Sequence, residues 1–206
     1  LGTTLLVYQL GRVGSKTAGT VLLLAGIVVG AFMSAINSFL MVMNREEISQ
    51  ITVWLMGGLS SRGWDHLRGA LPYFILGFAL IAFFARDLNV MVLGEDRAYQ
   101  LGIELERVQK MLVAGASLLT AAAVSVSGII GFVGLIVPHT VRLLIGPDHR
   151  WLLPASCLGG GLFLLIADTL ARTLLDPMEL PVGIITSMAG APFFLHLLLK
   201  KKQSPM

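Results

Sequence analysis

Side chains that could carry out chemistry are few in this chain and lie far apart. The segment GRVGSKT at residues 11–17 has the glycines, lysine and threonine of a phosphate-binding loop. It lacks the Gly-Lys-Ser/Thr core and a preceding buried strand, so no nucleotide site is predicted there. No HExxH or CxxC motif is present, and no nucleophile has a base nearby in sequence. The chain is therefore not expected to be an enzyme, and it offers no catalytic residue.

Two histidines are candidate metal ligands. His139 follows Pro138 at the end of an apolar run, and no second ligand lies at helical spacing from it. A structural or interfacial role is therefore favoured over metal binding. His196 lies one turn before a lysine cluster and is interpreted in the same way. No metal site and no cofactor bound by this chain are predicted.

One carboxylate, Asp168, lies deep in an apolar run, where proton-driven carriers usually place such a group. Arg172 follows four residues later on the same helical face, so the two can neutralise each other. A structural ion pair or an outward-facing contact is favoured over a proton relay. The sequence describes a gated pathway without a motor, and we expect the motor to be a separate protein.

The composition indicates an integral membrane protein. Of the 206 residues, 55% are hydrophobic and 13% are charged, and the mean hydropathy is +0.82. A soluble domain carries about 25% charged residues. The net charge of +3 does not indicate a nucleic-acid partner, and much of it comes from residues 200–202, a lysine cluster typical of a cytoplasmic anchor. The single cysteine, Cys157, is expected to be a small buried residue, and no signal peptide is expected.

The predicted fold is a single domain over residues 1–206, an all-α polytopic membrane bundle. It comprises the tail of one helix (1–10) and about six complete spans: 18–43, 69–85, 111–127, 132–146, 151–172 and 180–199. A span needs about 20 apolar residues. The stretch from Ser127 to Trp151 organises this layout, because its glycines, its proline and its basic turn at 146–150 divide one long apolar run into successive segments.

Two of the connections contain short apolar pieces. The piece from Ile51 to Leu59 is stopped by glycines and predicts a re-entrant or interfacial helix, with Trp54 and Trp64 at headgroup depth. The longest polar connection, 86–110, is divided into two short pieces by glycines at 94 and 102. Ala98, Tyr99 and Leu101 there predict an apolar patch that docks a soluble partner; a solvated loop is the open alternative.

Positive charge predicts the orientation. The lysine cluster should be cytoplasmic, and an even number of spans puts the Arg12/Lys16 turn on the same side. The connection 86–110 and the turn 146–150 are then cytoplasmic too, while 44–68 and 176–179 face outward.

Small residues recur every four positions on two of the predicted spans. Such stripes allow close approach of a second helix, the simpler explanation, or of a permeant molecule. Asn37, one position off the first stripe, needs a polar partner in hydrocarbon. The stripes are Gly26, Gly30, Ser34 and Ser38, and Gly183, Ser187 and Ala191.

Five segments together resemble the permease of ABC importers for iron chelates, haem and vitamin B12, the type II ABC importers. They are LLLAGIVVGAFMSA, WLMGGL, LGEDRAYQLGI, GFVGLIVPHTVRLLIGPDHRWLLPAS and ADTLARTLLDPMELPVGIITSMAGAPFFLHLLL. The resemblance covers essentially the whole chain in the family's order. Family permeases have ten spans, so this chain resembles the C-terminal two-thirds.

The resemblance implies a permease subunit that moves a ferric chelate (siderophore or haem) into the cytoplasm across a bacterial or archaeal cytoplasmic membrane. The implied partners are a second permease subunit in a homodimer, two ATPase subunits that hold ATP and Mg, an extracytoplasmic substrate-binding protein and the lipid bilayer. A cobalamin permease, an ion-gradient-driven secondary transporter or channel, and a structural fragment without transport are the alternatives.

The resemblance also assigns roles to residues. Arg172 would meet a glutamate of the binding protein, a role that competes with the Asp168 ion pair. The coupling segment is Leu93, Gly94, Glu95, Asp96, Arg97, Ala98, Tyr99, Gln100, Leu101 and Gly102. The pathway residues are Ser34, Asn37, Ser38 and Thr186 or Ser187, and the external gate helix contains Trp54, Leu55, Met56, Gly57 and Gly58.

Overall fold

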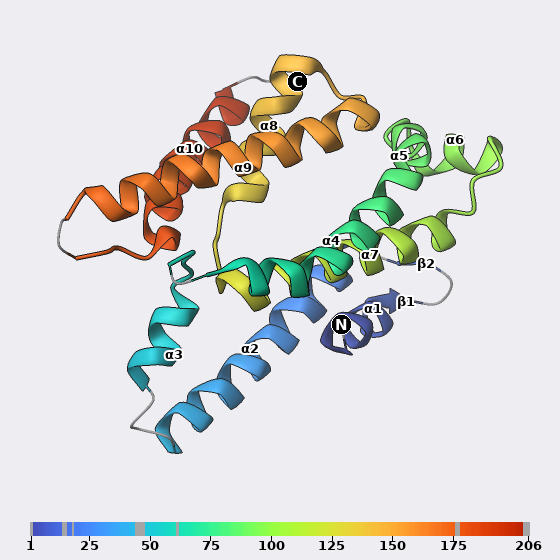
Figure 1. The fold of residues 1–206 in the computed structure, drawn as a ribbon. Coiled ribbons are helices and arrows are strands. Elements are labelled where there is room, and N and C mark those ends of the chain that lie inside the picture. The colour runs from blue at the N-terminus through green and yellow to red at the C-terminus, as the bar shows by residue number, and fades with distance from the viewer. Residues whose placement is uncertain are drawn as a thin grey trace.

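The computed structural model describes residues 2–13, 16–17, 19–43, 48–60, 62–175 and 178–203. These residues are mostly helical (Figure 1), so the predicted all-α fold class is confirmed. The helices are α1 (Gly2–Leu10), α2 (Gly19–Met43), α3 (Ile48–Leu55), α4 (Trp64–Phe83), α5 (Ala85–Met91), α6 (Glu95–Gln100), α7 (Leu105–Ser127), α8 (Val133–Ile145), α9 (His149–Thr173) and α10 (Val182–Gln203). Strands β1 (Arg12–Val13) and β2 (Lys16–Thr17) pair antiparallel.

Among the described residues, four helices are long and apolar enough to cross a membrane: α2 from Val21, α4, α7 and α9. The chain is therefore a multi-pass membrane protein. Two shorter apolar helices, α8 and the Val182–Leu197 part of α10, occupy the other predicted spans. The 13 residues of α8 rise only about 20 Å, against a hydrocarbon core of about 30 Å. Helix α8 is short because it lies between Phe132, its N-cap with a φ of 66°, and Gly146, its C-cap with a φ of 93°.

Helices α4 and α7 pack closely because small residues face each other along their antiparallel contact. A Cβ atom added to Gly77 would lie 3.1 Å from the carbonyl oxygen of Gly115, and one added to Gly115 would lie 3.3 Å from that of Gly77. Ala70 and Ala122, each seven residues from one of these glycines, are also buried. Such backbone-to-backbone packing stabilises helix pairs in lipid, where burial of apolar surface supplies no driving force between helices.

Helix α9 packs against α8 and α10 at different levels. A Cβ atom on Gly159 would lie 3.1 Å from Val137 of α8, so this glycine brings the two helices together. Near its C-terminal end, α9 forms a small core cluster of Ala167 and Ala171 with Val182 of α10. Cys157 lies on the exposed side of α9. Its predicted burial was wrong, because the buried face of α9 carries alanines and Leu152 instead.

Helix α2 packs against α1 near its N-terminal end and is exposed beyond that contact. A Cβ atom on Gly26 would lie 3.9 Å from Val7 of α1, whereas Gly30 has nothing within 4 Å. Every residue from 30 to 40 is exposed in the isolated chain. Lipid or other protein must cover this apolar surface in the membrane.

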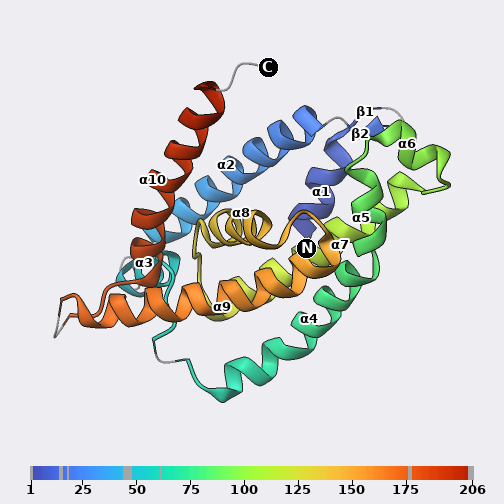
Figure 2. The ribbon, with the colours of Figure 1, turned by 90° about the horizontal axis from the view of Figure 1, so that it is seen from above.

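Figures 1 and 2 show how the connections are distributed over the two ends of the molecule. The β1–β2 hairpin, α5, α6 and the turn between α8 and α9 gather at one end, whereas α3 and the C-terminal end of α9 lie at the other. The charge pattern of the sequence predicts that these two ends lie on opposite sides of a membrane.

Candidate functional site

The end of the molecule that carries α3 is held together by main-chain contacts at three glycines, Gly57, Gly128 and Gly183, which we call the glycine junction. Gly57 and Gly128 have φ angles of +71° and +68°, which side-chain-bearing residues rarely adopt. The amide of Gly58 donates to Ser127 O at 2.8 Å, and that of Gly183 donates to Gly57 O at 3.3 Å. These bonds hold the turn after α3 against the end of α7 and the start of α10.

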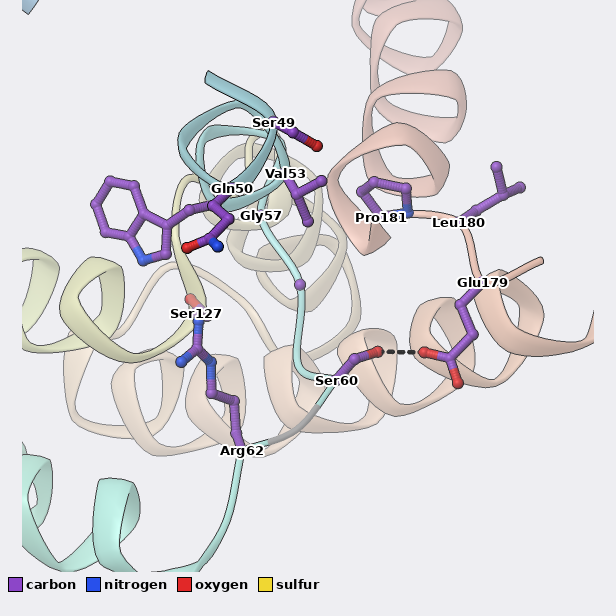
Figure 3. Close-up of a pocket in the computed structure, with 12 residues that line it drawn as sticks. Ser49, Gln50, Val53, Gly57, Ser60, Arg62, Ser127, Glu179, Leu180 and Pro181 are labelled. Carbon is purple, nitrogen blue, oxygen red and sulfur yellow. Dashed lines mark hydrogen bonds between the residues drawn. The ribbon is translucent and has the colours of Figure 1, made fainter. Parts of the chain in front are cut away.

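A cavity of about 700 Å³ opens beside the glycine junction (Figure 3). Ser60 Oγ donates a 2.6 Å hydrogen bond to Glu179 Oε2 across it, and Figure 3 shows Arg62 extending toward Ser127. The walls come from α3, the segment after it, the end of α7 and the approach to α10. The lining residues are Ser49, Gln50, Val53, Trp54, Gly57, Gly58, Ser60, Arg62, Ser127, Glu179, Leu180 and Pro181.

The predicted gate segment, Trp54–Gly58, straddles the end of α3 and the turn that follows it. With eight residues, α3 rises about 12 Å and does not span, as the sequence predicts. Trp54 and both glycines line the cavity. Gly57 and Gly58 of this segment also form the main-chain contacts of the glycine junction.

At the opposite end, α5 and α6 present a surface that we call the docking segment, residues 85–102. Gly94 and Gly102 have φ angles of +108° and +80° and interrupt the connection 86–110 as predicted. Tyr99 and Leu101 are 77% and 65% exposed. Ala98 is fully buried, so its predicted place in the exposed patch was wrong. The reason is that α6 packs against α5 and α7, and Ala98 lies on the side of α6 that this packing covers.

An unpredicted hydrogen-bond cluster joins the docking segment to the turn between α8 and α9. Asn89 Nδ2 donates to Asp148 Oδ1 at 2.6 Å, and Asn89 Oδ1 accepts from His149 N at 2.8 Å. Asp148 is the N-cap of α9 and accepts from Arg150 N at 3.0 Å. That backbone donor, followed by the Asn89 amide, lowers the pKa of Asp148 below its ordinary value of 3.8.

The predicted pathway residues occupy two different environments. Ser34, Asn37 and Ser38 lie on the exposed outer half of α2. Thr186 is fully buried and donates to Gly183 O at 3.2 Å, so in this conformation its hydroxyl lies inside the chain. Ser187 is half-buried. Of the two alternatives on α10, Ser187 is the one with accessible surface.

The ion pair between Asp168 and Arg172 is formed. Arg172 Nε lies 2.9 Å from Asp168 Oδ2, and the side chains of Arg172 and Asp168 are 44% and 18% exposed, respectively. The second carboxylate oxygen, Oδ1, is buried and has no hydrogen-bond partner among the described residues. Arg172 thus keeps an accessible face while pairing within its own helix.

His139 packs edge-on against Phe193 of α10, with ring centroids 6.1 Å apart, in the structural role that the sequence favours. Within the described ranges, no three His, Cys, Asp or Glu side chains come together as metal ligands.

Three features of these sites were not predicted from the sequence. Asp148 could have been identified as a helix cap from its place in GPDHRW. Its partner Asn89 lies 59 residues away, and Ser60 and Glu179 are separated by 119 residues, so no local pattern links either pair. Phe132 has a positive φ of 66° and packs against Gly190, a strained position without a sequence signal.

Comparison with known proteins gives a consistent result. Residues 1–200 match the FecCD transport family. The chain is 49% identical over 192 residues to the cobalamin import system permease protein BtuC of Halobacterium salinarum, covering 93% of this chain and 52% of that protein. It is 41% identical over 208 residues to the hemin transport system permease protein HmuU of Yersinia pestis, covering 98% and 61%.

A solved structure described as an inward-facing conformation of a metal-chelate type ABC transporter also resembles the chain. The TM-score is 0.87 at 33% sequence identity, and the likeness covers 97% of this chain and 64% of the other. The chain thus spans about half to two-thirds of the length of the proteins that it matches.

Proposed function

This chain belongs to the FecCD transport family, and we propose that it forms part of the membrane pathway of an ATP-driven importer for a large metal chelate. The cargo would be a ferric siderophore or haem, carried into the cytoplasm. Hydrolysis of ATP, with its Mg²⁺, would take place on separate ATPase subunits rather than on this chain.

The observation that carries the proposal is the exposed apolar surface of the docking segment. Tyr99 and Leu101 lie outside the four long spans, so lipid does not account for their exposure. Exposed apolar groups in such a position favour a protein partner. An ATPase subunit that binds there would supply the driving force that the chain's own residues lack.

The remaining partners follow from the same proposal. A second copy of the permease would complete the pathway, and an extracytoplasmic protein would deliver the cargo at the end that carries α3. The cytoplasmic membrane would hold the protein with the docking segment and the C-terminus inside. The grouping of the hairpin, α5, α6 and the α8–α9 turn at one end supports this orientation.

Arg172 would dock the delivering protein. Its side chain is 44% exposed while it pairs with Asp168, so the accessible part of the guanidinium can also contact an acidic side chain of a partner. Such a contact would set the orientation of the partner more than its affinity.

Cobalamin is the second candidate cargo. The 49% identity to a cobalamin import permease exceeds the 41% identity to a hemin permease. The small side chains at the predicted pathway positions accommodate either class of molecule.

Transport by the full-length permease that contains this chain tests the proposal. The permease would be reconstituted in proteoliposomes with and without its ATPase subunits and its binding protein. Uptake of ferric siderophores, haemin and cobalamin would then be compared. We expect uptake of one class that requires ATP and the ATPase. Uptake driven by an ion gradient without any ATPase would overturn the proposal in favour of a secondary transporter.

A further inference from the structure

We propose that Asn89 fastens the docking segment to the first turn of α9, so that movement of α6 is carried along α9 to the cavity at the other end. Asn89 would be a positioning residue in the coupling of ATP hydrolysis to transport. The inference rests on the proposed function, since it assumes that an ATPase moves α6.

Both ends of the Asn89 amide bond to the start of α9. A backbone N–H can only donate, so the bond from His149 N identifies Oδ1 as the acceptor and fixes the orientation of the amide. His149 Nδ1 lies 2.7 Å from the same oxygen and must donate to it. Nδ2 donates to Asp148, which already caps α9 through Arg150 N. One side chain therefore joins α5 to both the cap and the first residue of α9.

The contacts of the docking segment allow a displacement of α6 to reach α9. Helix α5 packs on both α6 and α9. The buried Ala98 and the positive-φ glycines at 94 and 102 fix how α6 sits between α5 and α7. Apart from the bonds of Asn89, α5 and α9 are joined by the packing of the two helices. Three directional hydrogen bonds oppose sliding of one helix along the other.

Helix α9 reaches from this cluster to the opposite end of the molecule. Its 25 residues rise about 37 Å. At its far end Ala171 is fully buried, and its carbonyl accepts from Leu180 N at 3.0 Å. The preceding residue, Glu179, accepts from Ser60 across the cavity. A shift of α9 along its axis would thus displace the segment that follows α3.

The first experiment measures coupling in the reconstituted full-length importer. Asn89→Ala should lower the number of cargo molecules taken up per ATP hydrolysed by about fivefold or more, the usual range of a coupling between sites. ATP turnover and co-purification of the ATPase should remain. Thr140→Ala, which removes a 2.8 Å hydrogen bond within α8 to Ile136 O, is the matched control and should leave the ratio unchanged.

An exchange of the two polar partners provides a rescue. Asn89→Asp alone places two carboxylates together and should uncouple. Asn89→Asp combined with Asp148→Asn restores the set of donors and acceptors. The new carboxylate at position 89 could accept from His149 and from the new amide at position 148, and the oxygen of that amide could still cap α9. Recovery of the uptake ratio in the double variant supports the fastening role. A double variant as uncoupled as the single one overturns it.

A crosslink tests the same idea without relying on the folding of an alanine variant. Asn89→Cys and Asp148→Cys would be combined with Cys157→Ser, because Cys157 is exposed. Before crosslinking, uptake per ATP should be low, and a short bis-methanethiosulfonate linker should restore it. If the linker blocks uptake instead, α5 and α9 must move relative to each other and the inference fails. Absence of ATP-dependent uptake in the unmodified importer would instead refute the proposed function itself.

Discussion

Substitution of Gly183 by alanine should weaken the packing of α10 against the turn after α3. Gly183 is the second residue of α10, and a Cβ atom there would overlap the carbonyl oxygen of Met56 and lie 3.3 Å from that of Ile129. Both are backbone atoms of neighbouring segments, so no side chain can rotate away to make room. The substitution must push α10 and the segment after α3 apart.

The magnitude follows from three contributions. Overpacking of a tight contact costs about 1–3 kcal/mol. The hydrogen bond from Gly183 N to Gly57 O, already 3.3 Å long, would be lost, at about 0.5–1.5 kcal/mol. Alanine regains at most about 1 kcal/mol in helix propensity. The net expectation is a loss of about 0.5–4.5 kcal/mol in the free energy of unfolding.

Unfolding of the full-length permease in detergent, titrated with SDS and followed by tryptophan fluorescence, measures this difference. Trp54 lines the cavity beside the glycine junction and should report the change. Gly30→Ala is the control, since a Cβ atom there meets nothing within 4 Å, and it should leave stability unchanged or raise it. Equal unfolding free energies for the two variants would refute the reasoning from backbone contact.

Three further predictions concern other parts of the chain. Gly77→Val should destabilise the α4–α7 pair by about 1–3 kcal/mol in the same SDS titration, whereas Gly161→Val, with open space around it, should cost less. Tyr99→Ala should reduce co-purification of the ATPase without changing the SDS midpoint, because the side chain is 77% exposed. The Arg150 N–H lowers the pKa of Asp148, so the stability advantage of wild type over Asp148→Ala should hold at neutral pH. It should vanish as the pH falls through the lowered pKa, below 3.8; an advantage that grows on acidification would contradict this.

The spans could be predicted because uncharged runs must form helices in lipid to satisfy their own backbone. Their boundaries were less accurate. Helix α7 begins at Leu105 rather than 111, because charges end the membrane segment and not the helix. The ion pair between Glu106 and Lys110, 2.8 Å long, lies along the first turns of α7. Helix α4 likewise begins at Trp64 rather than 69.

The candidate sites could be predicted in outline and not in their contacts. The sequence marks glycines at 57, 94, 102 and 128 as chain breakers, and each has a positive φ. Which segments meet at them depends on residues far away in the chain, and the local sequence carries no such information. The inward turn of Ala98 and the exposure of Cys157 follow from tertiary packing in the same way.

The glycine junction has a consequence for how cargo preference can change. The contacts of the glycine junction are made by main-chain atoms, so they impose no requirement on the identity of neighbouring side chains. Ser49, Gln50 and Val53 line the cavity and take no part in the main-chain contacts of the glycine junction, so under the proposed function they can be exchanged without disturbing it, whereas Glu179 is held by its bond to Ser60. If the proposed function holds, changes of cargo preference should accumulate at these three positions, while Gly57, Gly128 and Gly183 stay glycine.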